Sequence, residues 1–323
     1  MAKPFSSIGN QIGILRDRNL KIPDDKLDLV EHILKTENYY NIVNGYKCIF
    51  LDDELTSIEN DDRYKKDTSF FEIYEVFLFD REIRNLFLRS LLIFESHFKS
   101  VVSYRFSEQF KSQDSYLDEE NFVKDTNRLA DIKKLIRKTK EIIDDKKEKD
   151  GHSINHYYDK HSGHIPLWVL VNDYTFGNIS IFFSLLDDRL RNKIAKDFSE
   201  IYKYEYSTNV RVSSKILMGI SKTGTHFRNC CAHEMTLYNA SLKQRSATKE
   251  ISSELNVEEK YLQKNGLFSL YIQLKLVLPK KEFTFLKTSL MDLLGELEKA
   301  INENAYKTIT GIMGFPSNWD TVI

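Results

Sequence analysis

Side chains that can carry acid–base chemistry lie close together in Arg228-Asn229-Cys230-Cys231-Ala232-His233. An imidazole ionises near neutral pH and can move protons, whereas a guanidinium stays positively charged and pairs with anionic oxygen atoms. Asn229 precedes His233 by four residues, so on a helix the two share a face and the amide can orient the imidazole. Arg228 is rotated off that face, but its long side chain can reach around the start of the helix. These three residues are therefore the candidate chemical centre.

Two simpler explanations apply to the same stretch. In the first, Arg228 starts a helix and His233 is a partly buried histidine whose hydrogen bonds are satisfied. In the second, His226, Cys230 and His233 share a helical face and bind structural zinc with a fourth ligand from another segment. The only other cluster of histidines comprises His152, His156, His161 and His164. We expect no metal ion and no other cofactor.

The composition predicts an all-α fold that positions this centre. The 323 residues include only 5 prolines and 12 glycines, and 41% are hydrophobic, which favours long helices around a real core. We expect an N-terminal helical segment over residues 1–66, with a loop at 52–68. A bundle follows over 67–249, with an inserted charged arm at about 111–163. Further helices over 250–323 pack on the bundle.

The longest predicted helix brings a carboxylate into the core. From Ser69 to Phe110 the pattern is helical and has no proline or glycine. Glu95 falls on its apolar stripe, where a carboxylate is costly unless it is paired or hydrogen-bonded. Glu95 is therefore a candidate polar partner of the centre, and the simpler alternative is a salt bridge to Arg105 or Arg228. Elsewhere, Gly177 and Gly224 are expected to interrupt helices.

Charge, cysteine content and apolar runs restrict the class of protein. The net charge of −1 provides no global attraction to nucleic acid, although a local basic face is sufficient for binding. Three cysteines do not form a disulfide framework, which indicates reduced thiols in the cytosol. The first ten residues lack the apolar core of a signal peptide, and no apolar run approaches the roughly 20 residues of a membrane span. We expect a cytoplasmic protein without membrane contact.

The charged arm and several tyrosines are candidates for RNA contact. The basic residues of the arm that can follow a phosphate backbone are Lys133, Lys134, Arg137, Lys138 and Lys140. Lys99 and Arg105 on the long helix are further candidates. The tyrosines that can stack on bases are Tyr39, Tyr40, Tyr202, Tyr204 and Tyr206. Because acidic residues are interleaved along the arm, a solvated mixed-charge helix is the alternative.

Three blocks of sequence, in order along the chain, resemble the Abi-like family of bacterial abortive-infection proteins, the AbiD/AbiF group. The first comprises Lys3-Pro4-Phe5, Gln11, Leu15, Arg18, Asn38-Tyr39-Tyr40, Gly45-Tyr46 and Phe50. The second comprises Pro166-Leu167-Trp168-Val169-Leu170-Val171 and Thr175-Phe176-Gly177-Asn178-Ile179-Ser180. The third is the Arg228 to His233 stretch with Leu237-Tyr238-Asn239.

The resemblance implies a fold and an activity. Abi-like proteins are grouped with the HEPN superfamily, all-helical proteins whose Arg-x4-6-His motif marks metal-independent ribonucleases. Carried over, Arg228, Asn229 and His233 occupy the motif positions, and Glu95 stands at the place of the family's carboxylate. His233 would act as general acid or base, and Arg228 would neutralise charge on the phosphate. Cleavage would use the RNA 2′-hydroxyl and leave a 2′,3′-cyclic phosphate.

The resemblance also implies partners. HEPN sites are composite, with two motifs facing each other across a dimer, so one motif in this chain implies a homodimer. Members of the AbiF branch are associated with a structured non-coding RNA, which implies an RNA partner that restrains or guides the activity. One alternative is a non-catalytic RNA-binding protein of the same fold, whose motif serves RNA contact or dimerisation. A purely structural helical interaction protein is a further alternative.

Overall fold

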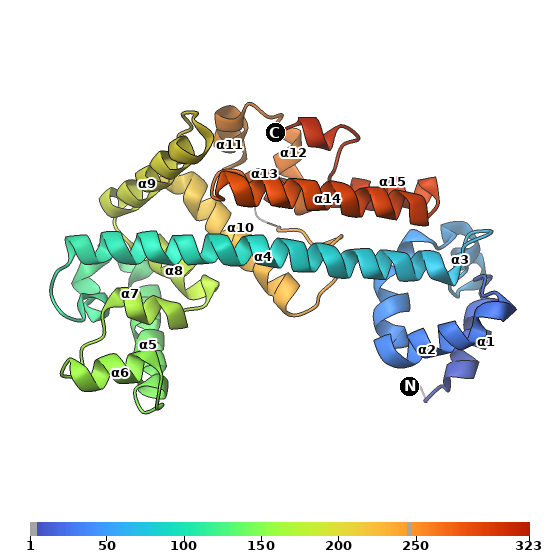
Figure 1. Ribbon diagram of the computed structural model, residues 1–323, viewed down its shortest axis with the longest axis horizontal. Coiled ribbons are helices and arrows are strands. Elements are labelled where there is room, and N and C mark those ends of the chain that lie inside the picture. The colour runs from blue at the N-terminus through green and yellow to red at the C-terminus, as the bar shows by residue number, and fades with distance from the viewer. Residues whose placement is uncertain (1–4, 244–246) are drawn as a thin grey trace.

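The protein is all-α, as the composition predicted. The computed structural model describes residues 5–243 and 247–323, and Figure 1 shows how their helices are arranged. Within these ranges β pairing is limited to two isolated bridges, Lys21 to Ser69 and Leu51 to Tyr64. None of the helices in the same ranges combines the length and the apolar composition that a membrane span requires.

Helix α4, Phe70–Gln109, is the central element, on which several other helices pack (Figure 1). Ser69 caps its first turn, and the Glu72 side chain accepts a hydrogen bond from the Ser69 backbone N–H in return, which completes a capping box. The absence of proline and glycine lets the helix continue for 40 residues. The predicted helix over 69–110 and the burial of Glu95 are both confirmed.

Helices α8, Phe176–Leu185, α9, Asp188–Tyr206, and α10, Ser214–Ala232, pack against α4, and α8 and α9 also pack against α10. Aromatic rings fill the space between them: Phe94 and Phe98 of α4 contact Phe176, and both also contact Phe198 of α9. Ser213 caps α10, and the helix runs without a break to the Arg228 to His233 stretch.

The two predicted glycine interruptions are wrong, for a reason that lies in packing. Gly224 is inside α10, where a Cβ atom would lie 2.8 Å from the Phe176 ring, so the glycine lets α10 and α8 approach closely. Gly177 is inside α8, whose N-cap is Thr175. The helical backbone is therefore interrupted at Tyr174 and Thr175, before Gly177 and not at it.

The N-terminal segment contains α1, Ile8–Asp17, α2, Leu27–Glu37, and α3, Asp53–Glu59. A π-helical turn, η2, covers Tyr40–Asn44 and contacts α4. The expected loop at 52–68 is wrong in part, because Asp52 accepts a hydrogen bond from the Leu55 backbone N–H and starts α3.

The charged arm holds α5, Leu129–Lys146, and α6, Ser153–Lys160, and the short helix α7, Leu167–Leu170, follows it. One face of α5 packs on α8, because Ile132, Leu135 and Ile136 are buried there. The short 3-10 turns among the described residues are η1 Asp24–Lys26, η3 Lys47–Ile49, η4 Ser115–Leu117, η5 Glu119–Asn121, η6 Thr126–Arg128, η7 Val171–Asp173 and η8 Trp319–Thr321.

The C-terminal helices pack on the bundle. Figure 1 shows α14, Lys280–Ala300, lying alongside α4. Helix α15, Glu303–Met313, follows it and reaches η3 of the N-terminal segment. Behind them, α13, Leu267–Leu274, is buried against α10. The short helices α11, Thr248–Leu255, and α12, Lys260–Gln263, precede α13.

Candidate active site

The Arg228 to His233 stretch forms the C-terminal end of α10, not the start of a helix. The helix ends at Ala232, and the backbone N–H of His233 donates to the Asn229 carbonyl at 3.0 Å. Glu234 then adopts a left-handed conformation with φ 53°, which turns the chain away from the helix axis. His233 is exposed at this turn, so its imidazole is accessible to a ligand.

The structure brings Glu95 and Arg228 together. The Glu95 Oε2 atom lies 3.4 Å from Arg228 Nε, and its Oε1 atom lies 2.8 Å from Lys99 Nζ. Glu95 is thus shared by two cations, and its pairing with Arg228 is the simpler alternative given above for this carboxylate. Arg105, the other arginine considered as a partner, pairs with Asp197 and Glu108 instead.

The contact between Glu95 and Arg228 is an ion pair without a hydrogen bond. Both Glu95 Oε2 and Arg228 Nε are buried and have no hydrogen-bond partner. A buried polar atom left in this state costs about 1–3 kcal/mol, and such atoms are a reason to look for catalytic or binding roles. The Nη groups of Arg228 make no hydrogen bond to the described residues, so they are available to an anionic oxygen.

Asn229 does not orient His233 through a hydrogen bond. Both side chains are exposed, and neither makes a hydrogen bond or ion pair with another described residue. The expected contact between amide and imidazole is therefore not formed. The neighbouring His226 differs, because its Nε2 atom lies 3.7 Å from Cys230 Sγ and its burial lowers the pKa of the imidazole.

The adjacent thiols do not supply a nucleophile. Burial raises the pKa of Cys231 to about 12 and also raises the pKa of Cys230. Both thiols are therefore protonated and unreactive at neutral pH. Within residues 5–243 and 247–323, no group of three or more His, Cys, Asp or Glu side chains has the arrangement of a metal site. The zinc-binding set proposed for His226, Cys230 and His233 is not assembled.

A buried carboxylate, Asp80, holds the segment that follows the Arg228 to His233 stretch. It is not among the site residues predicted from the sequence. Asp80 of α4 is completely buried, and it accepts hydrogen bonds from the backbone N–H groups of Leu237 at 3.0 Å and Tyr238 at 2.7 Å. The Tyr46 hydroxyl donates to it at 2.9 Å, and Arg84 forms an ion pair with it. The sequence feature that could have identified this site is the spacing of Asp80 and Arg84, which are four residues apart within an apolar helix and can therefore pair.

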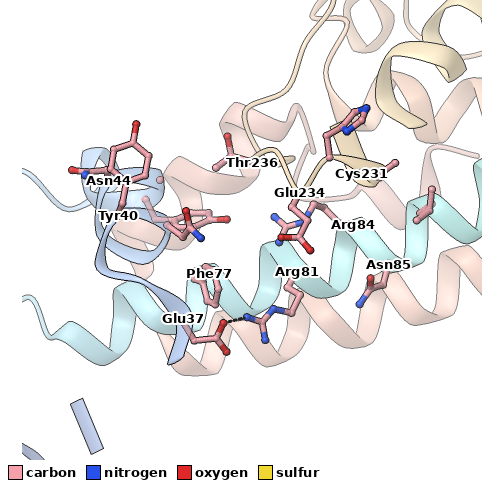
Figure 2. A pocket seen from close by; sticks show the side chains of 16 residues that line it. Glu37, Tyr40, Asn44, Phe77, Arg81, Arg84, Asn85, Cys231, Glu234 and Thr236 are labelled. Carbon is pink, nitrogen blue, oxygen red and sulfur yellow. Dashed lines mark hydrogen bonds and ion pairs between the residues drawn. The ribbon is translucent and has the colours of Figure 1, made fainter. Parts of the chain in front are cut away.

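This network joins two parts of the chain that are far apart in sequence. The Tyr46 and Tyr238 rings lie 5.6 Å apart, and the Tyr238 hydroxyl donates to the Gly45 carbonyl at 3.3 Å. Segment 37–46 thereby faces the turn that follows His233. A pocket of about 920 Å³ opens between them above α4. Figure 2 shows Tyr40 and Asn44 on one side of it.

The basic residues predicted to contact RNA divide into two groups. Those on α5 are all exposed, on the face opposite its buried residues: Lys133, Lys134, Arg137, Lys138 and Lys140. Glu141 partly neutralises that face, since it lies 3.3 Å from Lys138 Nζ. Lys99 and Arg105 are in ion pairs with side-chain exposures of 14% and 21%, so their charge is largely satisfied within the protein.

Comparison with known protein families matches residues 32–239 to the family described as Abi-like protein. In comparisons with curated proteins and with solved structures, no match to the chain was found. The family match covers more than half of the chain and includes Glu95, Asp80 and the whole Arg228 to His233 stretch. The chain therefore belongs to the Abi-like protein family, which connects it with abortive infection, a bacterial defence against phage.

Proposed function

We propose that this protein is a metal-independent endoribonuclease of the HEPN type that acts in phage defence. The observation that carries the proposal is the arrangement at the end of α10. There Arg228 lies beside the buried Glu95 with its Nη groups free, and the exposed His233 follows five residues later on a pocket wall. A cation and a proton-transfer group on the same helix end suit the cleavage of a phosphodiester.

The reaction uses the RNA as its own nucleophile. The 2′-hydroxyl attacks the adjacent phosphorus, a new P–O2′ bond forms, and the P–O5′ bond breaks. The products are a 2′,3′-cyclic phosphate and a 5′-hydroxyl. One proton leaves the 2′-hydroxyl and one must reach the 5′ oxygen, and His233 transfers one of them. Arg228 donates hydrogen bonds to the phosphate oxygens as their negative charge grows.

A homodimer supplies the second proton-transfer group. A single imidazole cannot remove one proton and donate another at the same moment, so concerted cleavage needs two. The motif supplies one His233 per chain. We infer that two chains bring their motifs to one phosphate, so that one His233 acts as base and the other as acid. Glu95 holds each Arg228 in place through the ion pair at 3.4 Å.

A structured non-coding RNA is the proposed partner, and the exposed basic face of α5 is its proposed contact. Five Lys and Arg side chains project from that face into solvent. Positive side chains on one helix face can follow a phosphate backbone, and the resulting affinity depends strongly on salt. A partner held there would restrain or guide cleavage at the end of α10.

The test compares His233→Ala and Arg228→Ala with a matched histidine variant. His32 is an exposed histidine of α2 that does not line the pocket, so His32→Ala is the control. Purified proteins are incubated with labelled RNA in EDTA. We expect cleavage by wild type and His32→Ala, cyclic phosphate ends, and loss of about 10²- to 10⁴-fold in rate for His233→Ala.

The outcomes separate the alternatives. If RNA is bound but not cut by any form, the protein is a non-catalytic RNA-binding protein. If cutting persists unchanged in both motif variants, the active site lies elsewhere. Cleavage of a substrate whose scissile nucleotide lacks the 2′-hydroxyl would contradict the proposed chemistry. Light scattering that finds a monomer under assay conditions would rule out the composite site.

A further inference from the structure

The pocket beside His233 is built by three separate parts of the chain. Segment 37–46 forms one wall, residues 77–88 of α4 form the floor, and residues 231–236 form the opposite wall. Figure 2 shows Tyr40 and Asn44 across the pocket from Glu234, with Phe77 and Arg81 between them. Its volume of about 920 Å³ lies at the upper end of the range of ligand sites. Because His233 lines it, a ligand bound here is adjacent to the proposed catalytic group.

The charges of the lining do not favour an anion. Arg81 is paired with Glu37 at 2.5 Å, and Arg84 is paired with the buried Asp80. Each arginine is therefore neutralised by a carboxylate of the protein. Glu234 makes no ion pair with a described residue and adds a negative charge to the wall. A phosphate would meet no surplus positive charge in this pocket, whereas an uncharged polar group would meet no electrostatic penalty.

The lining does favour a flat group with hydrogen-bond donors and acceptors. The side chains of Asn41, Asn44 and Asn85 are exposed and make no hydrogen bond to the described residues. Each amide offers both a donor and an acceptor. Tyr40 has 70% of its surface exposed, and its ring stacks on no described aromatic residue. An accessible ring beside free amides matches the way in which proteins hold unpaired nucleobases.

The pocket wall that carries Tyr40 has two uncommon backbone conformations, and both kinds are found more often at functional sites than elsewhere. Tyr40–Asn44 is a π-helical turn, a rare conformation that is frequent at such sites. Before it, Asn38 has φ 67° and ψ 122°, and its side chain accepts a hydrogen bond from the Tyr40 backbone N–H at 2.9 Å. Backbone held in a sparsely populated region costs stability and is retained where it positions a functional group.

We propose that this pocket binds a nucleobase of single-stranded RNA, with Tyr40 stacking on the base and the Asn44 amide bonding to its edge. The proposal rests on the ribonuclease function inferred above and names the subsite that selects the nucleotide beside the cut. The base occupies the pocket between segment 37–46 and the turn after His233. Its phosphate lies outside the pocket, toward Arg228.

The test measures binding in a form that cannot cleave. In a His233→Ala background, a fluorescent single-stranded hexanucleotide RNA is titrated at physiological ionic strength and its anisotropy is followed. Tyr40→Ala should weaken binding by about 5- to 150-fold, because base stacking on an aromatic side chain contributes this much. Asn44→Ala should weaken it by about 2- to 10-fold. Tyr40→Phe should retain the affinity.

The control is Tyr104→Ala, which removes a similarly accessible tyrosine, 61% exposed, from α4 outside the pocket. If Tyr40→Ala and Tyr104→Ala both bind like the background protein, the pocket proposal is wrong, even where wild type cleaves RNA in a His233-dependent way. If no form cleaves but binding depends on Tyr40 alone, the ribonuclease function fails and the base pocket stands. If no form binds the RNA, both are wrong.

Discussion

Replacing Asp80 by asparagine tests how the turn after His233 is held. Asp80 accepts hydrogen bonds from the Leu237 and Tyr238 backbone and from the Tyr46 hydroxyl, and it pairs with Arg84. Asparagine has nearly the same shape, but it has one acceptor oxygen where aspartate has two. Its NH2 group is a hydrogen-bond donor, and it would face the backbone N–H groups, the hydroxyl or the guanidinium, which are donors as well. The variant therefore removes charge and acceptors while it leaves the packing unchanged.

The expected cost follows from burial. Asp80 is completely buried and Arg84 is 8% exposed, so solvent screens their interaction very little. Removing one partner of a buried ion pair costs about 3–5 kcal/mol, because the other charge stays buried without compensation. We expect Asp80→Asn to lower the free energy of unfolding by this amount. The single remaining oxygen can accept either from the Leu237 and Tyr238 N–H groups or from Tyr46 and Arg84, so one of these two sets of donors loses its acceptor.

Urea unfolding followed by circular dichroism measures the change. Asp292→Asn is the matched control, since Asp292 is exposed on α14 and makes no ion pair with a described residue; it should shift stability by less than about 0.5 kcal/mol. The double variant with Arg84→Met should lose less than the sum of the single losses. A loss below about 1 kcal/mol for Asp80→Asn, or strict additivity, would refute the assignment of Asp80 as the anchor.

Two further predictions concern packing and the RNA contact. Gly224→Ala should destabilise the protein by about 1–3 kcal/mol, because its Cβ atom would lie 2.8 Å from the Phe176 ring; Gly295→Ala, where no atom lies within 4 Å, should not lower the melting temperature. Lys133→Glu with Lys134→Glu should weaken binding of the RNA partner. The slope of log affinity against log salt should become shallower by about two, and an unchanged slope would exclude this face of α5.

The long helix and the all-α fold were predictable because they depend on local signals. Residues 69–110 carry an apolar period and lack proline and glycine, and Ser69 with Glu72 forms a capping box. The errors arose where local signals and packing disagree. In the sequence, Gly224 predicts a helix interruption. In the structure, the Phe176 ring packs so closely on α10 that only a glycine fits at this position of the helix. Similarly, α3 forms in a polar segment because Asp52 caps it.

The candidate site was predictable in position but not in detail. The spacing of Arg228 and His233 indicated where chemistry could occur, and the burial rule indicated that Glu95 needed a partner. Sequence alone could not show that Asp80 holds the turn, because Asp80 and Leu237 are 157 residues apart. The expected contact between Asn229 and His233 also depended on the helix continuing, and the helix ends at Ala232.

The limits of the family match agree with the limits of the pocket. The matched region, residues 32–239, begins in α2 shortly before Glu37 and ends just after Tyr238. Its two ends are therefore the segments that form opposite walls of the pocket, and Asp80 and Tyr46 join them to each other. A chain that began after residue 46 or ended before residue 231 would keep α4 but lose one wall. Of the helices beyond the match, α14 lies on α4 and α13 lies on α10, and neither lines the pocket. It follows that the pocket, and not only the Arg228 to His233 stretch, is the unit within which the function of this chain should be sought.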